Sequence, residues 1–214
     1  MKRRAVRLND PLPGDSILEA LQSAAEAESA VENMLFELDA LESVDLPALD
    51  FRGCLFRRVQ FSDLRARRTF FTNCRFESCD FAGQTFRDGT VSRAEFVGCR
   101  GAGAAFEKMK LRDVLFRDCR LSDATLAECD LGRVELADCD LSRSMLYECA
   151  QKELVLEKCN LTAAELSGTS MAGVDLSGCT LDGLIAHGEL LRGATVNMNQ
   201  APLLMALFGI SVKI

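Results

Sequence analysis

Residues 129–149 read CDLGRVELADCDLSRSMLYEC, and two periods run through this stretch. Cysteines recur every ten residues, whereas leucines recur every five, at Leu131, Leu136, Leu141 and Leu146. A period of five fits neither a continuous α-helix, with about 3.6 residues per turn, nor a flat strand, whose side chains alternate. It fits a solenoid in which each five-residue unit forms one side of a coil and then turns a corner.

The same spacing covers most of the chain. Every fifth residue from Leu46 to Val196 belongs to one column of 31 positions, without an insertion or a deletion. The column members that lack a sizeable apolar side chain are Ala66, Gly101, Gln151 and Ala186. We expect Gly101 and Gln151 to mark a local distortion of the coil and not a site, and Gln151 to need a hydrogen-bond partner there.

The cysteines share a second column, two residues before the large apolar position. Its ten cysteines are Cys54, Cys74, Cys79, Cys99, Cys119, Cys129, Cys139, Cys149, Cys159 and Cys179. Six of them recur every twenty residues from Cys79 to Cys179, which indicates four units per turn and thiols stacked along one inner face. Free cysteine packs as a small, buried apolar residue, so we interpret the column as interior filler.

Chemical roles for the thiols are weaker hypotheses. Metal sites want converging ligands, usually with histidine, but the sequence has no Cys-x2-Cys pair and a single histidine, His187, which we expect at a surface corner. Disulfides between stacked coils are conceivable, because parallel strands lie about 4.8 Å apart. Parallel Cβ vectors and a reducing cytosol argue against them. We therefore expect no cofactor and no metal ion.

Units such as CDFAG (79–83), CRLSD (119–123), CDLSR (139–143) and VDLSG (174–178) resemble the pentapeptide repeat family. The resemblance covers about residues 46 to 196. It implies an all-β solenoid: a right-handed quadrilateral parallel β-helix with four pentapeptides per coil.

Three further stretches resemble the Qnr-type quinolone-resistance proteins within that family and their loopless chromosomal relatives. They are CRGAGAAF (99–106), VLEKC (155–159) and NMNQAPLLMALFGISV (197–212). The resemblance implies a homodimer that binds DNA gyrase and topoisomerase IV and imitates duplex DNA. This chain departs from the Qnr pattern because no loop interrupts its coil, and because an extension of about 45 residues precedes the repeats.

The residues before the repeats predict a helical cap. Ser16 to Glu19 fit a capping box, and apolar residues recur at roughly helical spacing behind them. We predict a helix over about residues 16 to 41, interrupted near Glu28, that packs on the first coil, with a separate partner-binding arm as the alternative. The predicted division is 1–45 as N-terminal cap, 46–196 as β-helix and 197–214 as a C-terminal helix and strand.

The C-terminal stretch predicts a short amphipathic helix. Pro202 suits its first turn, Gly209 ends it, and Ile210 to Ile214 alternate like a strand. The candidate dimer interface is Leu203, Leu204, Leu207, Phe208 and Ile210. A monomer could fold this stretch back as a cap, whereas the Qnr resemblance favours a homodimer joined through the C-terminus.

Charge is uneven along the chain. Residues 1–45 carry −6 and residues 46–100 carry +4, while 101–150 and 151–200 carry −3 each. We expect the acidic N-terminal segment to dock on the basic first half, although an acidic partner is the other possibility. The candidate partner surface is two columns of acids on opposite faces of the coil, Asp118 with Asp138 and Glu128 with Glu148, which could mimic phosphates or could be ordinary solvated positions.

The sequence favours a binding protein over an enzyme. It has no glycine-rich phosphate loop, and a side-chain-filled rod offers little room for a substrate. A net charge of −7 disfavours direct binding to nucleic acid, and no membrane segment or targeting signal stands out, so we expect a cytoplasmic protein. We predict that it binds gyrase or topoisomerase IV as a partial DNA mimic and changes fluoroquinolone sensitivity. The alternative is a rigid scaffold for an unrelated partner.

Overall fold

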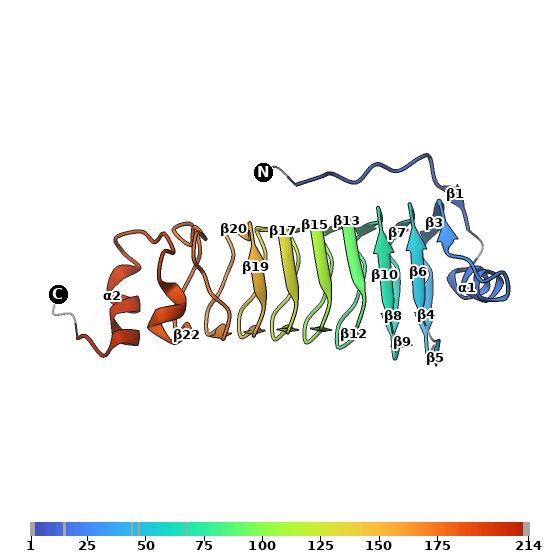
Figure 1. Cartoon of the computed structure of the whole chain (residues 1–214). Helices are drawn as coiled ribbons and strands as arrows, with labels where there is room; N and C mark the ends of the chain where they lie inside the picture. The colour runs from blue at the N-terminus through green and yellow to red at the C-terminus, as the bar shows by residue number, and fades with distance from the viewer. Residues whose placement is uncertain (1–2, 15, 44, 47, 67, 212–214) are drawn as a thin grey trace.

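The computed structural model describes residues 3–14, 16–43, 45–46, 48–66 and 68–211. The chain forms a parallel β-solenoid of about eight turns, with helix α1 (Ile17–Glu26) at one end and α2 (Ala201–Met205) at the other (Figure 1). The predicted fold class is confirmed.

The strands are short, because each five-residue unit spends part of its length on a corner. They are β1 (Leu12–Pro13), β2 (Val31–Glu32), β3 (Met34–Glu37), β4 (Ala40–Glu42), β5 (Asp45–Leu46), β6 (Leu49–Arg52), β7 (Leu55–Arg57), β8 (Gln60–Ser62), β9 (Arg65–Ala66), β10 (Thr69–Thr72), β11 (Arg75–Glu77), β12 (Thr85–Arg87), β13 (Thr90–Val97), β14 (Ala105–Glu107), β15 (Lys110–Arg117), β16 (Thr125–Ala127), β17 (Asp130–Ala137), β18 (Met145–Tyr147), β19 (Ala150–Lys152), β20 (Val155–Glu157), β21 (Glu165–Ser167) and β22 (Ile185–Ala186). Two 3₁₀ turns, Gly188–Leu191 and Ala206–Phe208, complete the set.

Four faces follow one another around each coil. Face A holds β2, β6, β10 and β19, and face B holds β3, β7, β11 and β20; the longer strands β13, β15 and β17 pass from A to B. Face C holds β4, β8 and a column of single bridges, and face D holds β12, β14, β16, β18, β21 and β22. Register partners lie twenty residues apart, as in Phe51 and Phe71, which confirms four units per turn.

The interior is built by stacking like residues on like. In the first half, phenylalanines one coil apart lie face to face: the ring centroids of Phe56 and Phe76 are 4.7 Å apart, and those of Phe76 and Phe96 are 4.5 Å apart. This separation falls in the range of favourable aromatic stacking, because the spacing of parallel strands sets it. From Leu121 onward leucine takes over the same column.

The corners impose a left-handed backbone on one residue in most of the five-residue units. Asp118, Asp123, Glu128, Arg133 and Asp138 have φ values of 53°, 59°, 52°, 55° and 53°. Glycine, asparagine and aspartate adopt this conformation at least cost, and they hold many of the corner positions. The identity of a corner residue therefore reflects backbone geometry as well as any function.

The N-terminal helix is shorter than predicted. Ser16 caps α1 by accepting a hydrogen bond from the Glu19 amide at 3.5 Å, but the helix ends at Glu26 and not near residue 41. Strands β2 to β5 follow and continue the coil toward the N-terminus, with Val31, Phe36 and Leu41 buried in the inward column. These side chains are five residues apart, and burial against the next coil outweighs their local helical pattern.

Helix α1 covers the open end of the solenoid. Ile17 and Leu21 are buried in the core cluster, and the Ile17 amide donates to Asp39 Oδ2 at 2.8 Å. The predicted packing of the helix on the first coil is confirmed. Cover of this kind shields unpaired strand edges from association.

The two irregular column positions have different solutions. Gln151 is half-buried, and its side-chain amide donates to the carbonyls of Ser170 and Ala172 in the next coil at 3.2 and 3.0 Å, so the expected partner is present. Gly101 is buried beside Leu121, whose Cδ2 would lie 2.9 Å from an added Cβ. Leu121 thus occupies the space that a larger residue would need.

The C-terminal helix agrees in part with expectation. Pro202 lies in the first turn of α2, and Gly209 ends the following 3₁₀ turn with φ of 70°. Ile210 and Ser211 are not part of a strand, and residues 212–214 of the predicted strand lie outside the described residues.

Candidate partner-binding surface

The four predicted acids all lie at exposed corners. Asp118 and Asp138 share the corner between faces B and C, one coil apart, because the Asp118 amide donates to Ala137 O at 3.0 Å. Glu128 and Glu148 share the corner between faces D and A. The structure therefore forms the two columns on opposite corners of the coil, as the sequence indicates, and they do not make one patch.

The two columns differ in how strongly they point to a function. Aspartate is favoured at a left-handed corner, and backbone geometry alone explains Asp118 and Asp138. Glutamate has no such preference, so backbone geometry does not account for Glu128 and Glu148. The Glu148 carboxylate also raises the pKa of the neighbouring Tyr147, chiefly by accepting a hydrogen bond from its hydroxyl group.

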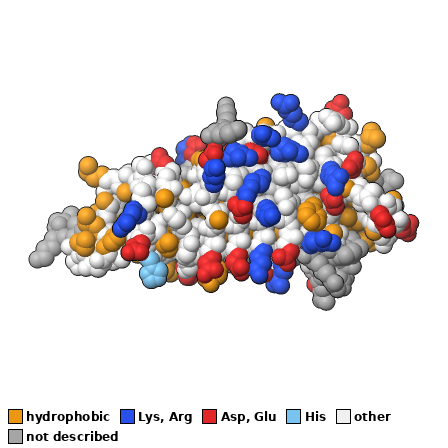
Figure 2. Space-filling model, viewed as in Figure 1, with side chains coloured by type: hydrophobic (Ala, Val, Ile, Leu, Met, Phe, Trp, Pro, Cys, Tyr) orange, Lys and Arg blue, Asp and Glu red, His pale blue; other side chains and the backbone are white. Residues whose placement is uncertain are grey.

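Many charges are paired between adjacent coils. The pairs twenty residues apart are Glu32–Arg52, Glu37–Arg57, Arg57–Glu77, Arg75–Glu95, Asp80–Arg100, Arg87–Glu107, Lys108–Glu128, Asp113–Arg133 and Asp123–Arg143. Figure 2 shows the result on one side of the rod, where blue and red side chains intermingle and no continuous acidic stripe runs along it. Among the described residues, Asp118 and Asp138 form no ion pair, whereas Glu128 lies 3.9 Å from Lys108.

The acidic N-terminal part does meet the basic first half. Glu32 lies 3.6 Å from Arg52, and Glu37 lies 3.7 Å from Arg57 and 2.5 Å from Arg58. The hydrogen bond from Arg58 is the main cause that lowers the pKa of Glu37. The expected docking is therefore seen as pairing between β2 or β3 and the coil that follows.

The five candidate interface residues at the C-terminus divide into two groups. Leu204 is 9% exposed and joins the core, and Leu207 is partly buried against it. Leu203, Phe208 and Ile210 are exposed, and apolar side chains are visible at this end of the rod as well as at the opposite end (Figure 2). The helix therefore closes the last coil with one side and leaves an apolar surface on the other.

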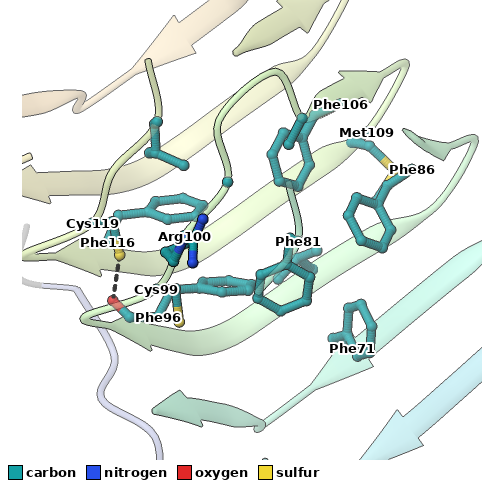
Figure 3. A pocket seen from close by; sticks show the side chains of 14 residues that line it. Phe71, Phe81, Phe86, Phe96, Cys99, Arg100, Phe106, Met109, Phe116 and Cys119 are labelled. Atoms are coloured by element: carbon teal, nitrogen blue, oxygen red, sulfur yellow. Dashed lines mark hydrogen bonds between the residues drawn. The ribbon is translucent and has the colours of Figure 1, made fainter. Parts of the chain in front are cut away.

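The thiols are interior packing residues, as predicted. All ten cysteines are free and buried. Figure 3 shows Cys99 and Cys119 beside the phenylalanine column, with the Cys119 thiol donating to the Phe96 carbonyl at 3.4 Å. Burial is the main cause that raises the pKa of the Cys74 thiol well above its usual value, which keeps that thiol protonated.

The remaining chemical groups are placed as follows. His187 is exposed at the start of a 3₁₀ turn, as expected. Within the described ranges, no three His, Cys, Asp or Glu side chains are grouped in a way that could hold a metal ion. The helices seen in those ranges are too short or too polar to cross a membrane.

Sequence reasoning missed two surface features. Residues 3–14, here called the strap, run from α1 back along the outside of the rod toward its middle (Figure 1). On face D, Met145, Tyr147 and Ile185 are 36%, 41% and 55% exposed. The basic composition of the strap was a visible signal, whereas the face D residues could be found only by separating outward from inward positions.

The four-sided coil and its two inward columns define a β-solenoid of the pentapeptide repeat class. Residues 69–142 match the model of the pentapeptide repeat region, and residues 155–195 match the model of eight pentapeptide repeats. The chain belongs to the pentapeptide repeat family.

Solved structures with a similar fold include two proteins of different biology. A trypsin-treated variant of QnrB1, a plasmid-mediated fluoroquinolone resistance protein, is 22% identical with a TM-score of 0.43, over 84% of this chain and 90% of that one. HetL, a protein involved in heterocyst differentiation regulation in the cyanobacterium Nostoc sp. strain PCC 7120, is 18% identical with a TM-score of 0.42, over 85% and 95%. No curated protein sequence matches the chain.

Proposed function

We propose that this chain is a non-enzymatic binding protein that presents the outer surface of a rigid rod to a protein partner. The main support is the division of the side chains between interior and outward positions. Two of every five residues fill the interior, whose two enclosed cavities hold only about 20 and 30 Å³, while the other positions face outward. Chemical variety is thus concentrated on the outer surface and not in the interior, and the larger hollows, of about 630 and 350 Å³, lie where α1 and α2 meet the ends of the rod.

The partner we propose is DNA gyrase or topoisomerase IV, with the rod acting as a partial DNA mimic. Support comes from the exposed carboxylates of Asp118, Glu128, Asp138 and Glu148, and from the Qnr-like stretches of the sequence. Among the described residues, Asp118, Asp138 and Glu148 form no ion pair, and Glu128 lies 3.9 Å from Lys108, so most of the charge at these corners is open to a partner. Binding there would change the sensitivity of the enzyme to fluoroquinolones.

Gyrase supercoiling with and without a fluoroquinolone tests this proposal. The protein is titrated from nanomolar to tens of micromolar concentrations, and relief of drug inhibition or direct inhibition is expected. The quadruple variant Asp118→Asn, Glu128→Gln, Asp138→Asn and Glu148→Gln should lose at least tenfold in potency.

A matched variant controls for net charge. Glu37→Gln, Glu77→Gln, Glu107→Gln and Asp123→Asn remove the same four charges from carboxylates that pair with arginine. This control should keep its potency. An inactive wild-type protein against both enzymes, shown to be folded, would reject the topoisomerase proposal and leave the rod as a scaffold for another partner.

We further propose that the protein is a homodimer joined through its C-terminus. Leu203 in α2, Phe208 in the following 3₁₀ turn and Ile210 after it expose apolar side chains at the end where α2 closes the coil. A second copy of the same surface would cover them in a self-complementary contact.

Light scattering after gel filtration measures this directly. The wild-type chain should give twice its mass of 23.5 kDa, and Leu203→Glu with Phe208→Glu should give the monomer mass. Leu38→Glu is the control, because Leu38 is 70% exposed near the opposite end. A monomeric wild-type protein would contradict the proposal.

The second candidate, a scaffold for an unrelated partner, is favoured by one observation. Met145, Tyr147 and Ile185 expose apolar area on face D, beside the Glu148 corner. Protein interfaces are enriched in tyrosine and methionine at their centres. If this face binds, Met145→Ser with Tyr147→Ser should leave all topoisomerase effects unchanged.

A further inference from the structure

The strap is fastened to the rod at intervals of whole coils. Near α1 its β1 strand pairs with β3, and the Leu12 amide donates to Asn33 O at 2.9 Å. Farther along, the Arg7 amide donates to Asn73 Oδ1 at 2.9 Å, and the Arg4 amide donates to Asp113 Oδ1 at 2.9 Å. The strap thus follows the corner between faces A and B.

At the far end of this path the Arg3 side chain lies in a defined site. Glu95, Leu115 and Glu135 are register partners on β13, β15 and β17, so one leucine lies between two carboxylates in a single column. Both terminal nitrogens of Arg3 lie 3.3 Å from Glu95 Oε1, and its Nε lies 3.7 Å from Glu135 Oε2. We call Glu95, Leu115 and Glu135 the Arg3 site.

Burial shows that this is more than a cluster of acids. Leu115 occupies an outward position, yet it is only 4% exposed, whereas Val155 at the equivalent position two coils on is 48% exposed. The side chains of Arg3 and Glu95 are 16% and 13% exposed. An arginine suits such a site, because its guanidinium binds carboxylates while its methylene stem covers apolar surface.

The part of the strap that precedes β1, residues 3–11, forms few hydrogen bonds with the rod. Residues 8–11 make no hydrogen bond to the described part of the rod, and the hydrogen bonds of residues 3–7 to the rod go to Asn73, Glu95 and Asp113. The rod also supplies its own partners for two of the acids, since Arg75 pairs with Glu95 and Arg133 with Asp113. The coil can therefore stay intact when the strap leaves.

We propose that the corner from Asn73 to the Arg3 site is a binding site for an extended arginine-containing polypeptide, occupied by residues 3–7 until a partner segment of the same chemistry displaces them. The strap supplies the recognition pattern: backbone amides that donate to Asn73 and Asp113, followed by an arginine in the Arg3 site. The surface is separate from the corners of Asp118 and Glu128, so the inference does not depend on the proposed topoisomerase partner.

Competition in trans tests the proposal on the full-length chain. The probe is a fluorescent peptide with the sequence of residues 1–10, MKRRAVRLND, followed by anisotropy. The strap-release variant is Arg3→Ala, Arg4→Pro and Arg7→Pro, because proline lacks the amide hydrogen that Arg4 and Arg7 donate. We expect the peptide to bind this variant at least tenfold more tightly than the wild-type chain, and more weakly at high salt.

Two controls keep the result specific. In the strap-release background, Glu95→Gln with Glu135→Gln should weaken peptide binding at least tenfold, whereas Glu107→Gln with Glu165→Gln on face D should not. A peptide with Arg3→Ala should also bind at least tenfold more weakly. Equal affinity for wild type and variant, or equal affinity with and without Glu95 and Glu135, would overturn the proposal.

A second variant covers the case in which the prolines disturb folding. Arg3→Ala alone vacates the Arg3 site and leaves the backbone contacts in place. It should show an intermediate gain in peptide affinity, with an unchanged melting temperature. No gain in a folded Arg3→Ala chain would count against the Arg3 site as the determinant of binding.

Discussion

At the scale of single residues, polar groups determine how adjacent coils are joined. Asp113 is 5% exposed and accepts from Arg133 at 2.6 and 2.9 Å and from the Arg4 amide. The hydrogen bond from Arg133 is the main cause that lowers the pKa of Asp113 to about 2. Asp123 pairs with Arg143 in the same geometry, but it is exposed to solvent.

Asp113→Asn tests the buried pair. Asparagine tolerates the left-handed corner, so the change removes charge without straining the backbone. We expect a loss of about 2 kcal/mol in unfolding free energy at pH 7, measured by chemical denaturation. Because the folded pKa lies below the unfolded value of 3.8, the stabilisation is present above pH 4 and disappears as the pH falls toward 2.

Asp123→Asn is the matched control for that measurement. It removes the same kind of pair at the same corner geometry, but in solvent, and it should change stability far less. Equal losses for the two variants, or a loss that persists below pH 2, would show that burial of Asp113 is not the cause.

Gln151→Ala tests the polar break in the apolar column. It removes donors to Ser170 O and Ala172 O, and we expect a loss of about 2 kcal/mol in unfolding free energy. Gln151→Glu should cost more, because its carboxylate faces two carbonyl oxygens. Gln60→Ala, at an exposed position, should be neutral; a neutral Gln151→Ala would mean that water replaces these bonds without cost.

At the scale of elements, the two ends of the rod are closed by different means. Helix α1 inserts Ile17 and Leu21 into the first coil, whereas α2 covers the last coil with Leu204. These apolar residues are buried within the chain itself. They therefore close the ends of the coil without needing a second molecule.

Leu204→Ala compared with Leu203→Ala measures that closure. Leu204 is 9% exposed, and its truncation should cost about 2–3 kcal/mol of unfolding free energy. Leu203 is 45% exposed, and its truncation should change stability by less than about 0.5 kcal/mol in the monomer. Denaturation at several protein concentrations separates any contribution from association; equal losses at low concentration would contradict the capping role.

At the scale of the whole molecule, each coil contacts mainly the coils beside it. A solenoid of this kind is nearly one-dimensional, so its stability is a sum of coils and of interfaces between neighbours. The end coils have one neighbour and the central coils have two. Opening should therefore start at an end.

Thiol labelling over time reports this order. The buried thiols should be unreactive in the native state, and all ten should react after full denaturation. In moderate denaturant, Cys179, which is 7% exposed near the C-terminal end, should be labelled before Cys119, which is 1% exposed at the centre. Mass spectrometry of the peptides identifies which cysteines are labelled at each time. Labelling of all sites at the same rate would indicate global unfolding and contradict opening from the ends.

The coil and its interior could be predicted from the amino-acid sequence. A five-residue period with one small and one large inward column is typical of a four-sided coil, so the number of faces and the burial of the cysteines could be predicted. The helix cap at Ser16 and the helix end at Gly209 could be predicted from local sequence signals. The start of the coil was missed because apolar residues near Val31 and Leu35 fit a helix locally. The five-residue series does extend back through Leu41, Phe36 and Val31, so the signal was present.

The contacts on the outer surface could not be predicted from the sequence and are seen only in the folded chain. Arg4 and Asp113 are in contact although they are 109 residues apart in the sequence. The strap is extended and polar, so no periodic pattern predicts where it lies on the rod. Outward side chains bear little packing constraint, so their pairing depends on which columns the coil brings together. The need to bury apolar columns repeats every five residues, so it is visible in the sequence. Contacts on the surface join residues that are far apart in the sequence, so they form only once the coils are stacked.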